Sequence, residues 1–151
     1  MASASSVRVQ SGFAATTPRS IVVVLRLEGL AVAAVSAALY ARTGASWWLF
    51  AALWLAPDLS MLGYLGGACR GARVYNAFHS YLAPGALALS ALLLHAHGLL
   101  PVALIWTNHI GVDRLLGYGL KYADGFKWTH LGRLGKGEAT SPGQESQARP
   151  A

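Results

Sequence analysis

Four apolar stretches of membrane-spanning length dominate this chain, and each of them carries ionisable side chains. The stretches run over about residues 21–41, 47–66, 74–94 and 101–120. A bilayer core demands about 20 predominantly apolar residues from one α-helix, so each stretch is long enough to cross it. In lipid the helix satisfies its own backbone polar groups. The sequence therefore predicts an all-α fold, an integral membrane bundle of four transmembrane helices.

Prolines mark the places where these helices are expected to be irregular. Pro57 predicts a kink beside Asp58, since proline removes a backbone hydrogen bond. Pro84 with Gly85 is expected to interrupt the third helix, and Pro101 suits the first turn of the fourth.

The composition supports lipid rather than water as the surroundings. Of the 151 residues, 54% are hydrophobic and 12% are charged, against about 25% charged residues in typical soluble domains. The net charge of +6 raises the question of nucleic acid, but the basic residues lie mainly between and beyond the apolar stretches. We expect membrane lipid, and no nucleic acid, as the partner. The composition leaves the oligomeric state open.

The ends of the chain are polar. Residues 1–20 are rich in Ala, Ser and Thr and predict a flexible N-terminal tail, and residues 137–151 predict a disordered C-terminal tail. A signal peptide is disfavoured because its apolar part would contain Arg26 and Glu28. Residues 121–136 mix aromatic and basic side chains and predict a short interfacial segment. The transmembrane domain with this segment is therefore placed at residues 21–136.

Basic residues also predict the orientation. The connection between the second and third helices holds Arg70 and Arg73, whereas the opposite connections hold only Arg42. Most of the other cations lie in the N-terminal tail and in the region from residue 121 onward: Arg8, Arg19, Lys121, Lys127, Arg133, Lys136 and Arg149. Since cytoplasmic loops carry the excess of Lys and Arg, both termini are expected in the cytoplasm.

With this orientation, ionisable groups from all four helices reach similar depths. At about 1.5 Å per residue, Glu28, Asp58, His79, Asp113 and His109 lie roughly 8–16 Å from the cytoplasmic helix ends. Each such group costs a few kcal/mol in hydrocarbon, so these groups are usually kept where they meet one another, a cavity or an ion. The sequence predicts one buried polar site.

Four of these side chains form a metal-ligand set. His109 and Asp113 are four residues apart and share a helix face, and Asp58 and His79 add a second carboxylate and a second imidazole. Such nitrogen and oxygen donors bind Zn²⁺, Mn²⁺ or Fe²⁺. The alternative is a structural network, in which Asp113 pairs with a buried cation such as Arg114 or Arg26 and the histidines hydrogen-bond between helices.

Further residues are candidates for supporting roles. Glu28 is the candidate general acid or base, with an ion pair to Arg26 as the alternative. Arg26, Arg114 and Lys121 are candidates for holding an anionic head group, although cations at helix ends are commonly just solvated. His130 is a candidate extra ligand if its segment folds back.

Three residues beside His79 are expected to orient its ring, since metal-bound histidines generally need such support. They are Tyr75, Asn76 and Ser80.

Several sequence blocks resemble one family. They are LRLEGL at 25–30, PDLSMLGYL at 57–65, YNAFHSY at 75–81, HIGVDRLLGYGLKY at 109–122 and THLG at 129–132. Over about residues 21–135 the chain resembles the bacterial membrane-protein family of domain of unknown function 4260. The resemblance implies an integral bacterial membrane protein and implies no established activity. With the four predicted spans, we expect a multi-pass protein of the bacterial inner membrane.

A more distant likeness concerns the candidate ligands. Pro57-Asp58, His79-Ser80 and His109 with Asp113 occur in the same order as motifs of the LexA-regulated inner-membrane metal-dependent hydrolases. That family normally has another acidic residue two positions after its first Asp, where this chain has Ser60. The likeness implies a metal-dependent hydrolase whose ligand set differs at this position.

Together these observations predict a membrane hydrolase acting on lipid-like substrates at the cytoplasmic leaflet. A divalent metal would be held by Asp58, His79, His109 and Asp113, with Glu28 moving protons. Two alternatives stay open at this point. One is a non-enzymatic membrane protein with a structural polar network, and the other is a proton or ion conductor.

Overall fold

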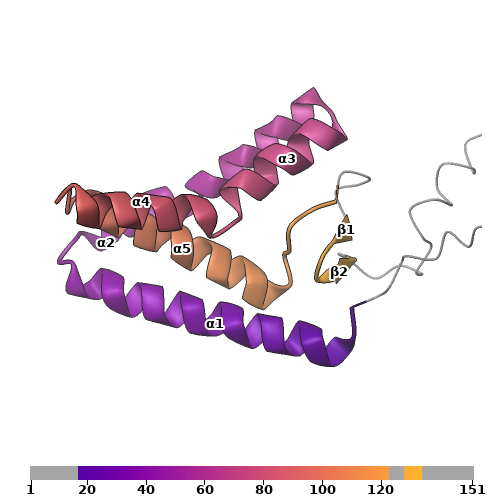
Figure 1. Ribbon diagram of the computed structural model, residues 1–151, viewed down its shortest axis with the longest axis horizontal. Coiled ribbons are helices and arrows are strands. Elements are labelled where there is room, and N and C mark those ends of the chain that lie inside the picture. The colour runs from indigo at the N-terminus through magenta and orange to yellow at the C-terminus, as the bar shows by residue number, and fades with distance from the viewer. Residues whose placement is uncertain (1–16, 123–127, 134–151) are drawn as a thin grey trace, which may run out of the picture.

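The computed structural model describes residues 17–122 and 128–133, and it is helical almost throughout (Figure 1). Its elements are α1 (Arg19–Arg42), α2 (Trp47–Trp54), the 3₁₀-helix η1 (Ala56–Gly66), α3 (Ala68–Phe78), α4 (Leu82–Leu93), α5 (Leu99–Leu116) and the two-residue strands β1 (Trp128–Thr129) and β2 (Gly132–Arg133). The predicted all-helical class is confirmed, with β1 and β2 as a small antiparallel pair. The predicted tails fall largely on residues 1–16 and 134–151, which lie outside the described residues, as do residues 123–127 of the predicted interfacial segment.

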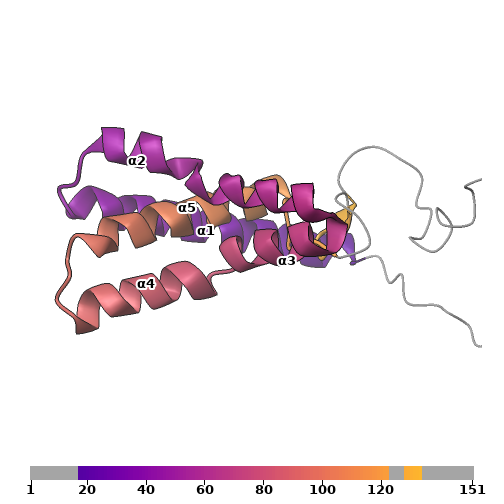
Figure 2. The same ribbon diagram turned by 90° about the horizontal axis from the view of Figure 1, so that it is seen from above.

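The chain runs back and forth along one long axis. α1 makes the first pass, α2 with η1 the second, α3 with α4 the third and α5 the fourth. The connections at residues 43–46 and 94–98 lie at the same end of this axis (Figures 1 and 2). The start of α1, the turn at Gly67 and the β1–β2 pair lie at the opposite end. Side chains of η1, α3 and α5 at similar positions along this axis can therefore meet.

Two glycines let α1 and α5 approach closely where they cross. A Cβ added at Gly111 would lie 2.8 Å from the Ala33 backbone nitrogen, and one added at Gly29 would lie 2.8 Å from the Gly111 carbonyl oxygen. Both distances are shorter than non-bonded atoms tolerate, so only glycine fits at this crossing. Small residues at such crossings are typical of helices that pack without a water-driven hydrophobic effect.

Two helical stretches among the described residues are long and apolar enough to cross a membrane. Arg19–Arg42 has a mean hydropathy of 2.0 and Trp47–Gly66 of 1.3 over their most apolar windows. Only 17% and 11% of these windows are buried inside the protein, whereas the core helix of a soluble protein would be mostly buried. Large apolar side chains such as Leu27, Leu65 and Leu82 are exposed. These two helices give the chain a membrane-compatible surface.

The third pass is broken at a different place from the one the prolines predict. The break lies at residues 79–81, between α3 and α4, and not at Pro84 and Gly85, so that expectation was wrong. Pro84 occupies the first turn of α4, where a missing backbone N–H costs nothing because no intrahelical acceptor is available to it. The helix instead ends at His79, whose carbonyl is held by a side chain from α5.

Two further irregularities are the change from α2 to η1 and the early end of α5. α2 ends at Trp54 and the chain continues as η1, so the second pass changes its helical geometry beside Asp58, where a kink was expected. A 3₁₀ run of 11 residues is unusually long, and such stretches often mark functional positions. α5 ends at Leu116, earlier than the predicted Leu120, because Gly117 adopts a left-handed conformation with a φ of 94°. Glycine takes up this helix-ending conformation without a steric penalty.

Candidate metal centre

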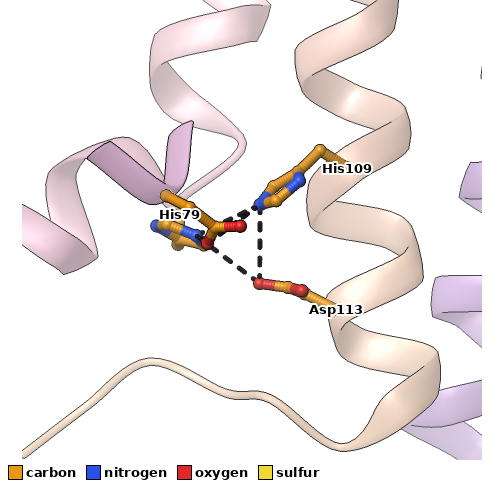
Figure 3. A group of neighbouring side chains, drawn as sticks. His79, His109 and Asp113 are labelled. Carbon is orange, nitrogen blue, oxygen red and sulfur yellow. Dashed lines mark hydrogen bonds and ion pairs between the residues drawn. The ribbon is translucent and has the colours of Figure 1, made fainter. Parts of the chain in front are cut away.

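Four side chains from three passes converge on one point. Asp58 comes from η1, His79 from the end of α3, and His109 and Asp113 from α5. One ligand atom from each residue lies within 4.8 Å of the ligand atoms of all the others. Both histidines are buried and both aspartates are half-buried. Figure 3 shows His79, His109 and Asp113 directed toward one another. The convergence predicted from helix depth is observed.

The spacing of the four atoms fits a metal ion. The two histidine Nε2 atoms are 3.3 Å apart. The Nε2 of His79 lies 3.4 Å from Asp58 Oδ1 and 3.5 Å from Asp113 Oδ2, and the corresponding distances from His109 are 3.6 and 3.8 Å. Ligands about 2.0–2.2 Å from a tetrahedral zinc ion are separated by about 3.3–3.6 Å. The four groups can therefore hold an ion of this size with little movement.

The ring of His79 is oriented for ligation. Its Nδ1 lies 3.0 Å from the Tyr75 carbonyl oxygen, which can only accept a hydrogen bond, so Nδ1 carries the proton. In the neutral ring this leaves an unprotonated Nε2 lone pair directed at the other ligands. The Tyr75 ring stacks on the imidazole with centroids 3.8 Å apart. Such support on the far nitrogen is usual for metal-bound histidine.

His109 is positioned by packing. The edge of the Trp54 ring faces its imidazole, with centroids 5.1 Å apart. Trp54 donates its indole N–H to Asn108 Oδ1 at 2.9 Å, and Asn108 donates to the Ala33 carbonyl at 2.7 Å. This chain of contacts connects the site to α1, which supplies no ligand. Its members were not identified from the sequence, although a polar Asn108 beside His109 in an apolar helix was an available signal.

The broken end of α3 is stabilised by side chains of α5. The Trp106 indole donates to the Phe78 carbonyl at 2.7 Å, and Arg114 Nη2 donates to the His79 carbonyl at 3.2 Å. Ser80 Oγ contacts the Ala77 carbonyl at 3.4 Å. Carbonyls at a helix end lack intrahelical partners, and these three contacts supply them. The α5 side chains thereby keep His79 at the break.

Only one of the three expected supports of His79 acts on its ring. Tyr75 does so, as described above. Asn76 instead pairs with the backbone of Lys121, donating to its carbonyl at 2.8 Å and accepting from its N–H at 2.7 Å. Ser80 contacts only the helix end. Asn76 therefore fixes the segment after α5 against α3.

A second polar cluster lies on the cytoplasm-facing side predicted from the sequence. The backbone N–H of Leu120 donates to His130 Nδ1 at 2.9 Å, and Arg114 Nη1 lies 2.9 Å from His130 Nε2. Burial and the neighbouring Arg114 charge lower the pKa of His130 below its usual range. The Lys121 ammonium lies 4.2 Å from the Tyr75 ring centroid, and burial lowers its pKa to about 8. Lys121 and Arg114 thus sit beside the four-ligand cluster.

The remaining predicted residues lie outside the four-ligand group. Glu28 is exposed on α1 and lies outside the four-residue group, so the expectation that it joins the buried polar site was wrong. Arg26 is exposed and places Nη2 3.5 Å from the Leu116 carbonyl at the end of α5. His130, a candidate extra ligand, bonds to Leu120 and Arg114 and lies outside the four-residue group.

The ion pairs of Asp113 differ from those expected for a structural network, in which Asp113 would pair with Arg114 or Arg26. Asp113 lies within ion-pair distance of His79 and His109. Within the described part of the chain, Asp113 makes no ion pair with Arg114 or Arg26. The carboxylate is therefore directed at the other three ligands rather than at a buried arginine.

A comparison with protein-family models identifies the family of this chain. The family model described as "Domain of unknown function (DUF4260)" matches residues 22–134. The chain belongs to this family. The DUF4260 match contains all four converging side chains together with Arg114, Lys121 and His130. No curated protein and no solved structure matches the chain.

Proposed function

We propose that this DUF4260 protein is an integral-membrane, metal-dependent hydrolase of lipid-like substrates. The observation that carries the proposal is the convergence of Asp58, His79, His109 and Asp113, whose ligand atoms all lie within 4.8 Å of one another. With His79 Nδ1 protonated, its Nε2 and two carboxylate oxygens present lone pairs to a common point. Such an arrangement is stabilised by a cation. Zn²⁺, Mn²⁺ and Fe²⁺ all suit this donor set.

The membrane setting is part of the proposal. We place all four passes across the bacterial inner membrane, with both termini in the cytoplasm. Two helices of spanning length, their low burial and the exposed apolar side chains on every pass support this placement. Soluble monomers rarely expose apolar patches larger than a few hundred Å². The basic residues near Gly67 and at both ends of the chain support the orientation.

The reaction adds one water across an ester, amide or phosphoryl bond. The hydroxyl goes to the electrophilic centre and a proton goes to the leaving group. When bound, the metal supplies a water of lowered pKa and polarises the scissile group. Asp58 is the more exposed of the two aspartates, with 39% of its side chain exposed against 16% for Asp113. Glu28 is the candidate for proton delivery, and Arg26, Arg114 and Lys121 are the candidates for steadying an anionic head group.

Metal analysis of the purified protein tests the proposal. We expect the parent to retain about one divalent metal per chain, and we expect Asp113→Asn and His79→Gln to retain more than about tenfold less. His97→Gln is the matched control, since His97 is exposed and outside the four-residue group. The metal-loaded parent should also cleave a chromogenic ester of a medium-chain fatty acid, and Asp113→Asn should not.

One result decides against the hydrolase. If the parent binds no divalent metal, the cluster is a structural network of the kind that joins membrane helices. In that case Asp113→Asn should lower the thermal stability of the protein while leaving its metal content unchanged at zero.

A further inference from the structure

An apolar cavity of about 110 Å³ is lined by residues that neighbour the ligands. Its walls come from α2, η1, α3 and α5. Two lining residues directly precede ligands in the sequence, Pro57 before Asp58 and Phe78 before His79. A third, Ile105, lies one helical turn before His109 on the same face of α5. None of the four ligands lines the cavity, but three of its lining residues are neighbours of ligands in the sequence or on the same helix face.

Two aromatic side chains in the wall of this cavity hold each other in place, and the cavity opens at the protein surface. Trp106 donates its indole N–H to the Phe78 carbonyl, and the two rings stack with centroids 5.5 Å apart. The only polar atom that Trp106 brings is thereby occupied. Ala56 and Phe78 are both exposed, so the cavity opens sideways through η1 and the end of α3.

The polarity of the site changes in one direction along α5. Ile105 lines the cavity, His109 and Asp113 belong to the ligand cluster, and Arg114 with Lys121 follows at the far end. The order is apolar chain, reacting centre and cation, which matches the order of parts in an amphiphile. Because the apolar lining starts at the residues next to the ligands, hydrocarbon would begin directly at the reacting bond.

We propose that the cavity binds the first methylenes of a fatty acyl chain, so that the substrate is an acyl ester or acyl amide rather than a phosphoryl compound. This inference rests on the proposed function. A membrane lipid's phosphoryl group is separated from its hydrocarbon by polar atoms, whereas an acyl carbonyl carries its chain directly. Hydrolysis places the water hydroxyl on the acyl carbon, breaks the C–O or C–N bond and sends a proton to the alcohol or amine. The products are a fatty acid and the freed polar group.

The volume sets how much of the chain the cavity can hold. A protein cavity of about 150 Å³ accommodates benzene, so about 110 Å³ accommodates a few methylenes. The rest of the chain would leave through the opening at Ala56 and Phe78 into the bilayer. Chain-length selectivity is therefore confined to the carbons nearest the carbonyl.

Alkyl hydroxamates test the cavity on the full-length, metal-loaded protein in nanodiscs. The hydroxamate oxygens bind a divalent metal in place of an acyl carbonyl, and the alkyl group extends from that point. We expect calorimetric affinity to rise about fourfold per methylene from acetohydroxamate to butanohydroxamate and hexanohydroxamate, and to level off at octanohydroxamate.

Two exposed alanines provide a matched pair of variants. Ala56→Phe fills the opening of the cavity and should abolish the increase of hydroxamate affinity with alkyl chain length. The affinity for acetohydroxamate should stay within about twofold of the parent. Ala51→Phe, two residues before Leu53 on α2 and therefore on another face, should behave as the parent. An undiminished gain in Ala56→Phe, or no gain in the parent, overturns the acyl site while acetohydroxamate binding still supports the metal.

A second measurement keeps the cavity testable if no metal is present. A fatty acid with a diazirine near its carboxyl end is photolysed with the metal-free protein, and the labelled residues are identified by mass spectrometry. Label concentrated at Val102 and Trp106, and lost in Ala56→Phe, supports the cavity. Label spread evenly over the exposed helical faces overturns it.

Discussion

His79 takes part in the fold and in the candidate metal centre through different atoms. Its backbone carbonyl ends α3 and accepts from Arg114, while its imidazole donates to the Tyr75 carbonyl and faces the other ligands. We therefore expect a change that releases the carbonyl to move the ring as well. Arg114, first considered as a head-group binder, has this additional positioning role.

Replacement of Arg114 by methionine tests that role. Arg114→Met keeps much of the aliphatic length but leaves the His79 carbonyl without its donor, which should destabilise the protein by about 1–3 kcal/mol. Metal affinity should fall about 10- to 100-fold, because the ring is no longer held in place. Thermal unfolding and metal titration of the purified variant measure the two effects.

A second arginine provides the control. Arg26 also contacts a helix-end carbonyl, but it is exposed and the contact is 3.5 Å long. Arg26→Met should change stability by no more than about 0.5 kcal/mol. Equal effects of the two substitutions would show that Arg114 contributes only surface charge.

At the scale of single residues, the sequence predicts the candidate ligands better than the residues that hold these ligands in position. Counting residues from helix ends placed Asp58, His79, His109 and Asp113 at one depth. The same count also placed Glu28 there, although Glu28 is exposed and outside the group. Trp54 and Asn108 were missed because their contacts join α2, α5 and α1, and no spacing within one helix encodes such contacts.

Among the helices, the α1–α5 crossing depends on the absence of side chains. Gly111→Ala would place a methyl group against the α1 backbone near Ala33 and Gly29, and should destabilise the protein by about 1–3 kcal/mol. Gly85→Ala is the matched control, since a Cβ at Gly85 on α4 meets nothing within 4 Å. It should be neutral or stabilising by up to about 1 kcal/mol.

Thermal unfolding in one detergent compares these two variants. Equal loss of stability would mean that α1 and α5 can separate by a few tenths of an ångström without cost. The crossing would then not be the close contact described above.

The boundaries of helices were predictable where local chemistry sets them. The predicted 21–41 lies within two residues of α1, since Pro18 and Thr43 border a single apolar run. The break in the third pass was misplaced because a proline in a first turn costs nothing. Its true position depends on Trp106 and Arg114, which lie 28 and 35 residues further along the chain. Local sequence signals carry no information about partners at that separation.

For the whole molecule, the native Cys69 reports on orientation. This exposed residue lies near the turn between η1 and α3, at the end proposed to face the cytoplasm. In intact cells a membrane-impermeant maleimide should leave Cys69 unlabelled until the membrane is permeabilised. In a Cys69→Ser background, Thr43→Cys and His97→Cys at the opposite end should be labelled from outside. Labelling of Cys69 in intact cells would reverse the proposed orientation.

A bound metal would connect three of the four passes. The ligands come from η1, α3 and α5, so metal binding should stabilise their arrangement. At a free metal concentration about 100 times Kd, the stabilisation is about 2.7 kcal/mol. A chelator should therefore lower the melting temperature of the parent and leave that of Asp113→Asn unchanged. Acidification should weaken the stabilisation, since ligands must be deprotonated to bind.

The break in the third pass also has a consequence for biosynthesis. Its open carbonyls at Phe78 and His79 are capped by Trp106 and Arg114, which the ribosome adds later. At about 5–20 residues per second, Trp106 is synthesised roughly 1–6 s after Phe78. In the proposed four-pass arrangement, α3 and α4 would not form a finished span during that interval, because unsatisfied backbone groups are costly in lipid. The third pass should therefore leave the translocon together with α5, as one hairpin.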